Sequence, residues 1–145
     1  LDGDTIDLAG TRVRLEGIDA PEIGETCVRH GGGSWPCGTA AAEALKRLIG
    51  GAQVTCSPQG LDTYGRVLGI CRIGGRDIGD EMVRNGLAWA FVKYSASYVN
   101  SEAEARLARR GVWQALQPMA LNVAFPARTA GAVGLRRAGT ARLRA

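Results

Sequence analysis

The sequence predicts an α+β domain built around a small β-barrel. The predicted elements follow in the order strand pair, helix, strand pair, helix, strand and helix, so short strands dominate and helices lie at the margins. The chain has 145 residues, a length that suits one hydrophobic core. Its 21 glycines indicate many turns between short elements rather than a fold of long helices.

A β-hairpin opens the chain. Its two strands are expected at residues 5–8 and 11–18, and the Ala-Gly pair between them suits a two-residue turn. Apolar and polar residues alternate along both strands, so one face is expected in the core and the other in water. The turn pairs residues whose numbers add to about 19, which places Asp4 across from Leu15.

The middle of the chain predicts a loop, a helix and a second strand pair. Residues 22–36 are rich in glycine and predict a long irregular loop. Helix-forming residues follow at 39–49 and stop at a Gly-Gly pair. Residues 53–56 and 66–73 then predict two strands that are joined by a polar connection.

The next segment predicts a short helix, a strand and a last helix. The short helix is expected at 79–85 and the apolar strand at 87–92. The sequence Ser-Glu-Ala-Glu has the form of a capping box and predicts that a helix opens at Ser101 and runs to Arg110. The three tryptophans are expected to be packing residues.

The chain divides into a folded domain and a basic tail. We assign residues 1–117 to the domain and residues 118–145, in which Ala and Arg dominate, to a poorly ordered tail. The formal net charge is +4, but the tail holds five of the arginines and no acid. The domain itself carries 13 basic and 14 acidic residues, so the basic pI is no evidence for nucleic-acid binding. No apolar run approaches the length of a membrane span.

The four cysteines favour two local disulfides. Locality pairs Cys27 with Cys37 and Cys56 with Cys71, and an antiparallel strand pair lets the second pair face each other. The alternatives are other pairings, or four buried free thiols in a cytosolic protein. No Cys-x-x-Cys pair supports a zinc site. Disulfides indicate an oxidising compartment, so we expect a periplasmic or secreted protein, here as a processed chain or fragment that does not begin with Met.

Three acidic residues are expected to meet at one end of the first hairpin. Asp4 begins the first strand, and Asp19 and Glu22 follow the second strand after a bend at Gly17. Converging carboxylates form a hard-oxygen site that suits Ca²⁺. The alternative is that these acids only make turns, which is common at strand ends.

Two arginines lie near the same place. Arg14 has the opposite strand parity to the core residues beside it, and Arg66 follows a turn that leads into a strand. Arginine binds phosphate through paired hydrogen bonds, so both are candidate phosphate ligands. The alternative is that they are solvated surface charges or partners of carboxylates.

Three segments of the chain resemble the signature segments of the staphylococcal nuclease family: Leu1–Ile6, Val13–Glu22 and Asp62–Arg66. Two further matches are residues 82–88 and 102–113. The resemblance extends over roughly residues 1–117, in the family's order. It implies an OB-like five-stranded β-barrel with about three helices, and a calcium-dependent nuclease that acts on DNA, RNA or both, expected as a monomer.

The resemblance also implies a role for each matching residue. Asp4, Asp19 and the carbonyl group of Ala20 would bind Ca²⁺. Glu22 would act as the general base on the attacking water, and Arg14 and Arg66 would hold the scissile phosphate. The 5′ oxygen would leave, giving 3′-phosphate ends.

Two tyrosines, Tyr64 and Tyr94, resemble those that line the family's nucleotide pocket. The chain departs from the family in its short first strand, in the loop that holds Cys27 and Cys37, and in its tail. Two alternatives are therefore kept: a non-catalytic module of the same fold that binds nucleic acid or peptide, and a disulfide-bonded secreted domain with a structural calcium.

Overall fold

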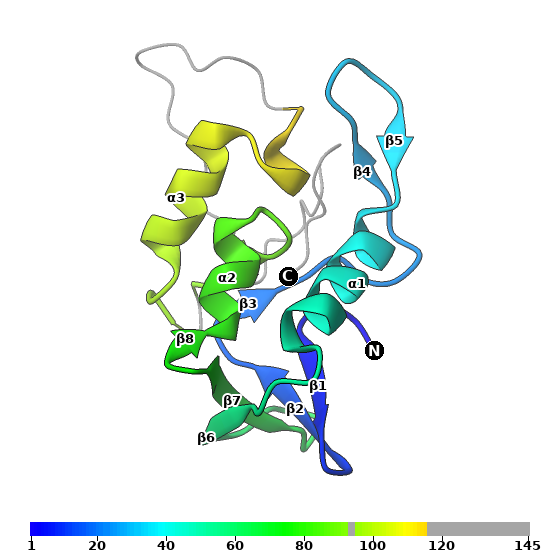
Figure 1. Ribbon diagram of the computed structural model, residues 1–145. Coiled ribbons are helices and arrows are strands. Elements are labelled where there is room, and N and C mark those ends of the chain that lie inside the picture. The colour runs from blue at the N-terminus through cyan, green and yellow to red at the C-terminus, as the bar shows by residue number, and fades with distance from the viewer. Residues whose placement is uncertain (93–94, 116–145) are drawn as a thin grey trace.

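The computed structural model describes residues 1–92 and 95–115, and it confirms the α+β class (Figure 1). The helices are α1 (Cys37–Ile49), α2 (Ile78–Arg84) and α3 (Val99–Ala108), followed by the 3₁₀ turn η1 (Gly111–Trp113). The strands are β1 (Thr5–Leu8), β2 (Thr11–Leu15), β3 (Ile18–Asp19), β4 (Cys27–Val28), β5 (Ser34–Trp35), β6 (Thr55–Leu61), β7 (Val67–Ile73), β8 (Arg76–Asp77) and β9 (Trp89–Ala90).

A five-stranded mixed sheet forms one layer of the fold. Its strands follow the order β1-β2-β7-β6, and β8 pairs with β7. The pairing of β2 with β7 is parallel, and the other pairings are antiparallel. Figure 1 shows α1 and α2 lying over this sheet, with α3 beside α2. Two smaller ladders, β3–β9 and β4–β5, lie outside the sheet.

The first hairpin has the predicted register. Ile6 pairs with Val13, and the amide of Leu15 donates to the carbonyl oxygen of Asp4 at 2.8 Å. Ala9 and Gly10 both have positive φ angles, 52° and 89°, as a type I′ turn requires. The second strand ends earlier than predicted, because the backbone turns after Leu15 and resumes only as the two-residue β3.

Several predicted boundaries were wrong. The loop at 22–36 contains the β4–β5 ladder, and α1 begins at Cys37, two residues earlier than expected. Strand β6 continues to Leu61, because β7 supplies a partner along its length. The apolar run at 87–92 forms a ladder only over the two residues of β9, since its partner β3 is equally short.

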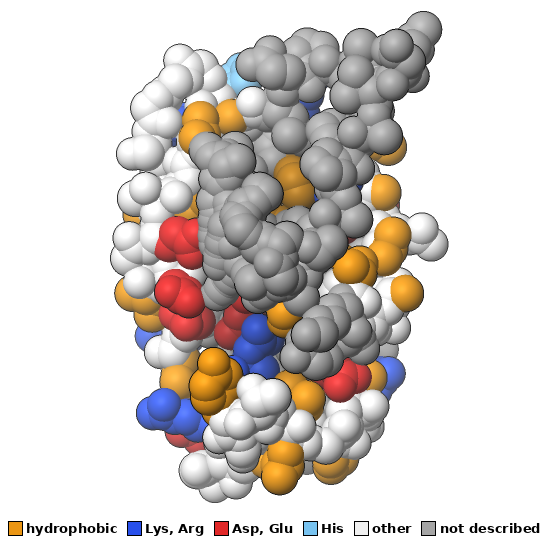
Figure 2. All heavy atoms as spheres, turned by 180° about the vertical axis from the view of Figure 1, so that it is seen from behind, with side chains coloured by type: hydrophobic (Ala, Val, Ile, Leu, Met, Phe, Trp, Pro, Cys, Tyr) orange, Lys and Arg blue, Asp and Glu red, His pale blue; other side chains and the backbone are white. Residues whose placement is uncertain are grey.

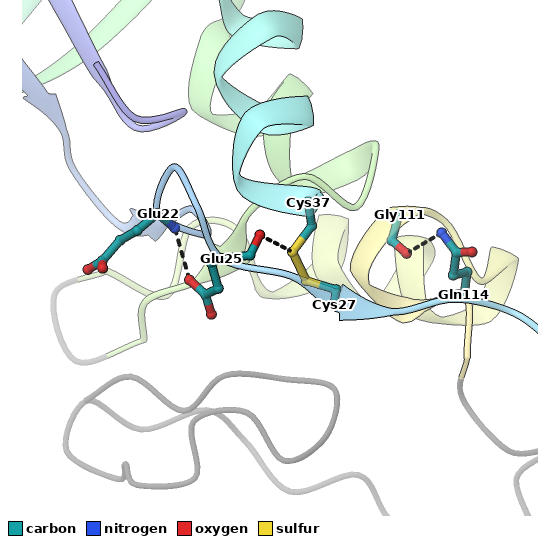
Figure 3. Close-up of a disulfide and its surroundings, with 6 residues drawn as sticks. All are labelled: Glu22, Glu25, Cys27, Cys37, Gly111 and Gln114. Carbon is teal, nitrogen blue, oxygen red and sulfur yellow. Dashed lines mark hydrogen bonds between the residues drawn. A yellow bond between two sulfur atoms is a disulfide. The ribbon is translucent and has the colours of Figure 1, made fainter. Parts of the chain in front are cut away.

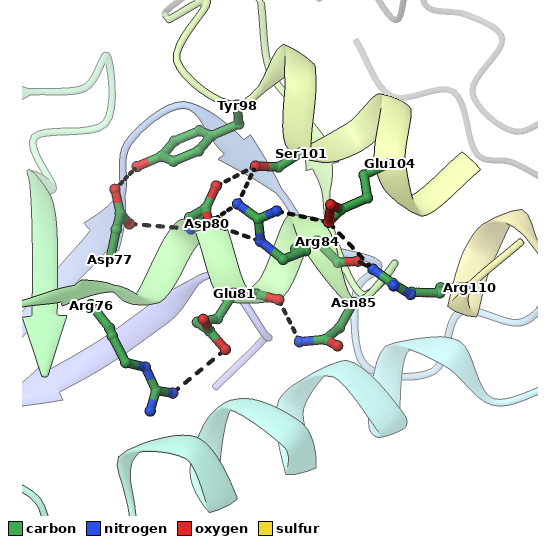
Figure 4. Close-up of polar contacts among 10 residues, drawn as sticks. All are labelled: Arg76, Asp77, Asp80, Glu81, Arg84, Asn85, Tyr98, Ser101, Glu104 and Arg110. Atoms are coloured by element: carbon green, nitrogen blue, oxygen red, sulfur yellow. Dashed lines mark hydrogen bonds and ion pairs between the residues drawn. The ribbon is translucent and has the colours of Figure 1, made fainter. Parts of the chain in front are cut away.

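The capping-box prediction was also wrong. Helix α3 starts at Val99, so Ser101 lies within its first turn and its hydroxyl contacts Asp80 of α2 (Figure 4). Glu104, the glutamate three residues after Ser101, binds Arg84 of α2 at 2.7 Å. Glu102 accepts a hydrogen bond from the amide of Ala90 at 2.9 Å and pairs with Arg106 at 3.0 Å.

A polar network joins α2 to α3 (Figure 4). Arg84 binds Asp80 and Glu104, each at 2.7 Å, and these partners raise the pKa of its guanidinium. The hydroxyl of Tyr98 donates to Asp77, which itself caps the N-terminus of α2. Burial and this carboxylate raise the pKa of Tyr98. The network explains how two short helices keep a fixed orientation.

The apolar side chains form two clusters. The first lies between the sheet and helices α1 and α2, and it includes Ile6, Leu15 and Leu45. The second surrounds the Cys27–Cys37 disulfide. Its other members are Trp35, Trp89, Ala105, Val112 and Trp113. The prediction that the tryptophans are packing residues is confirmed.

Both predicted disulfides are present. Cys27 is bonded to Cys37, and Cys56 to Cys71, whose backbones face each other across the β6–β7 ladder. Closing loops of these lengths stabilises a fold by about 3 kcal/mol each in the chain-entropy model. In the described part of the chain, the helices are too short and too polar to traverse a lipid bilayer. The predicted tail and Tyr94 lie outside the described residues.

Gly86 provides a stability test of the contact between α2 and η1. A Cβ at Gly86 would lie 2.2 Å from the carbonyl oxygen of Arg110, and the φ angle is +73°. We expect Gly86→Ala to lower the free energy of unfolding by about 3–5 kcal/mol, from strain and overpacking together. Gly74→Ala is the control, because Gly74 also has a positive φ but has open space around it. Its expected loss is about 1–2 kcal/mol; equal losses in urea unfolding would contradict the packing argument.

Candidate active site

One cavity of about 400 Å³ collects the charged side chains that the sequence singled out. It lies where the start of β1, the end of β2, β3 and the turn before β7 meet. Five candidate residues line it: Asp4, Arg14, Asp19, Glu22 and Arg66. Residues more than 60 positions apart in the sequence thus share one space, because β2 pairs in parallel with β7.

Asp4 is held at the base of the cavity. The residue is 6% exposed, and its Oδ2 accepts a hydrogen bond from the amide of Ala20 at 2.9 Å. The hydroxyl of Thr5 donates to the other carboxylate oxygen at 3.1 Å. Such hydrogen bonds offset the hydration that a buried carboxylate loses. The contact to Ala20 also fixes the backbone that leads to Glu22.

Arg14 lies between two carboxylates. Its Nη2 is 3.5 Å from Asp4 and 3.6 Å from Asp19, and all three side chains are nearly buried. Its Nη1 donates to the carbonyl oxygens of Leu15 and Ile18, both at 2.9 Å. The guanidinium is therefore fixed by four partners. Strand parity predicted only that Arg14 lies outside the core; the side chain is in fact 12% exposed and faces the acids rather than open solvent.

Arg66 lines the same cavity and is held by Asp62. The carboxylate of Asp62 accepts from its Nε at 2.6 Å and from the amides of Tyr64 and Arg66, both at 2.8 Å. Burial raises the pKa of Asp62, but these hydrogen bonds outweigh it and leave the pKa below its ordinary value. The guanidinium also lies over the Tyr64 ring, 5.4 Å from the centroid. Asp62 thus holds both the turn before β7 and the Arg66 side chain that follows it.

Glu22 is exposed at the rim of the cavity. Its amide donates to Oε1 of Glu25 at 2.9 Å, and the amide of the next residue, Ile23, donates to Oδ1 of Asp2 at 2.9 Å. The backbone around Glu22 is therefore held by two carboxylates, one from Glu25 in the same loop and one from Asp2 near the N-terminus. Tyr64, predicted to stack on a base, also lines the cavity and is 83% exposed.

Sequence reasoning missed several lining residues. Asp2, Glu16, Asp62 and Phe91 also line the cavity. Asp62 carried a signal, since a carboxylate four residues before an arginine in a glycine turn can accept from that arginine. Asp2 carried none, because its contact with the loop at Ile23 depends on the tertiary fold. Ala20, whose carbonyl group was predicted to bind Ca²⁺, is fully buried, and its amide donates to Asp4.

The cavity has a strong negative charge. Six carboxylates line it, against two guanidiniums: Asp2, Asp4, Glu16, Asp19, Glu22 and Asp62 against Arg14 and Arg66. Figure 2 shows acidic side chains gathered beside basic ones on one face of the molecule. A phosphodiester anion would be repelled by such a site without a further cation. The donors are hard oxygens, which fit Ca²⁺ or Mg²⁺. Among residues 1–92 and 95–115, however, no three acidic, histidine or cysteine side chains are already gathered as a metal site.

Comparisons with known proteins point to one family. The profile described as staphylococcal nuclease homologue matches residues 12–115. An uncharacterized endonuclease of Escherichia coli is 34% identical over 126 residues, covering 82% of this chain and 76% of that protein. The probable staphylococcal-like nuclease CAN2 of Oryza sativa subsp. japonica is 36% identical over 109 residues, covering 74% of this chain and 27% of the rice protein.

A third relative has a different kind of name. The succinoglycan biosynthesis protein ExoI of Rhizobium meliloti (strain 1021) is 34% identical over 118 residues, covering 79% of this chain and 62% of that protein. The chain therefore spans less than two thirds of ExoI and about a quarter of CAN2.

Arg14 gives a direct test of the charge arrangement. We expect Arg14→Met to lower the free energy of unfolding by about 3–5 kcal/mol at neutral pH, because it leaves Asp4 and Asp19 buried without their cation. Arg76→Met is the control, since Arg76 is 60% exposed and makes a surface pair with Glu81. Its expected cost is below about 1 kcal/mol. Urea unfolding measures both, and a small loss for Arg14→Met would refute the proposed charge compensation.

Proposed function

The chain belongs to the staphylococcal nuclease family, and on that premise we propose that it is a nuclease that hydrolyses the phosphodiester bonds of DNA, RNA or both. One observation carries the proposal. Two guanidiniums, two buried carboxylates and one exposed carboxylate line the same cavity. That set provides anion binding, cation binding and a base, which together are what phosphodiester hydrolysis needs.

We propose Ca²⁺ as the cofactor. Asp4 and Asp19 are the side chains that would hold it, together with the backbone carbonyl of Ala20. The fit rests on the excess of carboxylates over guanidiniums around the cavity and on their hard oxygen donors. When bound, such a cation supplies Lewis acidity and neutralises charge on the phosphate.

Glu22 would be the general base. Its carboxylate is exposed at the cavity rim, where water reaches it, while its backbone is tied to Glu25. A carboxylate within hydrogen-bond range of a water accepts its proton as the water attacks phosphorus. The two buried aspartates are less suited to this role, because Arg14 already holds both.

The arginines would bind the phosphate. Negative charge grows on the phosphate oxygens and on the leaving oxygen as the bond breaks, and fixed donors in a partly desolvated cavity stabilise it. Arg14 is held rigidly by four partners, and Arg66 by Asp62. The 5′ oxygen is the proposed leaving group, which gives 3′-phosphate ends.

The exposed ring of Tyr64 would stack on a base beside the scissile phosphate. Its ring lies under the Arg66 guanidinium and lines the cavity. Stacking contributes about 1–3 kcal/mol per base and tolerates any sequence. A single strand presents unstacked bases, so we propose a preference for single-stranded substrate. Separately, we propose that the enzyme is a monomer.

The two disulfides support an oxidising location. Cytosolic reductants keep thiols reduced, whereas periplasmic and secreted proteins retain such bonds. Both disulfides lie within the described fold, and each packs in one of the two core clusters. We propose that the protein works in the periplasm or outside the cell.

The alternative is a non-catalytic module that binds nucleic acid or peptide. The name of the relative ExoI, a biosynthesis protein, keeps this alternative open. The retention of all five charged groups around one cavity favours the nuclease. The calcium experiment below separates the two, since a module of this kind would bind single-stranded DNA without cleaving it.

Glu22→Gln tests the base. We expect kcat to fall by about 10²–10⁴-fold while KM stays within about two-fold, because the amide cannot accept the proton but leaves the phosphate ligands in place. Cleavage of a labelled single-stranded oligonucleotide measures both constants. Glu43→Gln, on α1 and outside the cavity lining, is the matched control. Unchanged kcat in Glu22→Gln would remove this residue from the mechanism.

Calcium removal tests the cofactor. Cleavage should stop in chelator and return with added Ca²⁺. A nucleoside monophosphate should stabilise the protein against heat only when Ca²⁺ is present, by about 2.7 kcal/mol at a hundred times its Kd. Differential scanning calorimetry measures this. Cleavage that persists in chelator would rule out the metal, and calcium-dependent protection without cleavage would favour the binding module.

A further inference from the structure

The loop that carries Glu22 folds back on itself (Figure 3). The amide of Glu22 donates to the side chain of Glu25 at 2.9 Å, and the amide of Glu25 donates to the carbonyl oxygen of Glu22 at 2.8 Å. These two hydrogen bonds close a four-residue turn. The side chain of Glu25 therefore holds the backbone of the proposed base.

The turn rests on the start of α1. The amide of Gly38 donates to the carbonyl oxygen of Glu25 at 3.1 Å. A Cβ at Gly38 would lie only 1.7 Å from the carbonyl oxygen of Glu22. The Glu22 backbone thus occupies the space that any side chain at this position would fill. Helix α1 forms a rigid base under the turn.

A disulfide fastens the other end of the same loop. Cys27 is 3% exposed and Cys37 is fully buried, and both pack in the cluster around Trp89 and Trp113. Cys37 immediately precedes Gly38, and its Sγ lies 3.6 Å from the carbonyl oxygen of Glu25. The contacts of Glu22, Glu25 and Cys27 therefore converge on the first two residues of α1.

We propose that Glu25 and the Cys27–Cys37 disulfide are positioning elements for Glu22, and that the site is fully active only when this bond is formed. The inference rests on the proposed function, in which Glu22 is the base. An exposed glutamate on an unfastened loop would sample many orientations. Misplacing a catalytic group by about 1 Å costs about 10²-fold in rate, so the loop anchor acts on turnover rather than on substrate binding.

The second disulfide provides a matched control. Cys56–Cys71 closes a loop with a sequence separation of 15, against 10 for Cys27–Cys37, so the two bonds constrain the unfolded chain similarly. It lies in the β6–β7 ladder, where regular hydrogen bonds also hold both strands. Neither of its cysteines lines the cavity.

The first experiment compares kinetic constants of folded variants with single-stranded DNA and calcium. For Cys27→Ala/Cys37→Ala we expect kcat to fall at least ten-fold with KM within two-fold, while Cys56→Ala/Cys71→Ala keeps kcat within two-fold of the parent. Glu25→Ala should lose ten-fold, and Glu25→Gln should retain activity, because its amide oxygen still accepts from the Glu22 amide. Combining the Cys27→Ala/Cys37→Ala pair with Glu22→Gln should cost nothing beyond Glu22→Gln alone. Equal kcat in the two cysteine pairs would overturn the proposal.

A second measurement tests whether Glu25 and the Cys27–Cys37 disulfide, here called the loop anchor, hold the Glu22 loop, and it does not depend on catalytic activity. Hydrogen exchange by NMR should show the amides of Glu25 and Gly38 exchanging at least ten-fold faster in Cys27→Ala/Cys37→Ala, and unchanged in Cys56→Ala/Cys71→Ala. An inactive parent protein with this exchange pattern would refute the nuclease proposal but leave the anchor intact. Unchanged protection of both amides would refute the anchor itself, whatever the activity.

Discussion

The architecture of the site depends on one guanidinium placed between two buried carboxylates. Arg14 contacts Asp4 and Asp19, and it also binds two carbonyl oxygens where β2 ends and β3 begins. Charges removed from water need such partners. Removing one member of a buried ion pair destabilises the protein, because the other charge stays buried without compensation. Because Asp4 in turn binds the amide of Ala20, the same contacts set the direction of the chain toward Glu22. The contacts that compensate the buried charges therefore also position the loop that carries Glu22.

Local rules predicted those parts of the fold that depend on neighbours in the sequence. The Ala9-Gly10 turn determines the hairpin register, and that register alone places Asp4 across from Leu15. The Cys56–Cys71 pairing followed from the antiparallel strands that contain it. The positions of the three acids and two arginines made them candidates, but the family resemblance was needed to favour a site over turns and surface charges. The structure places all five around one cavity.

Features that depend on distant contacts escaped prediction. The Ser-Glu-Ala-Glu sequence has the form of a cap, but Asp80 and Arg84 of α2 draw Ser101 into the helix, and α3 begins earlier. The need for glycine at position 38 arises from a backbone 16 residues away, so it left no local signal. The presence of Asp2 in the cavity has the same origin, since its partner lies at Ile23.

The distribution of indole rings has a practical consequence. All three tryptophans belong to the cluster around the Cys27–Cys37 disulfide, and the sheet cluster contains none. Tryptophan fluorescence therefore reports on the half of the molecule that anchors the Glu22 loop. Circular dichroism, in contrast, reports on the helices and strands of both halves. The two spectroscopic signals follow different parts of the same small protein.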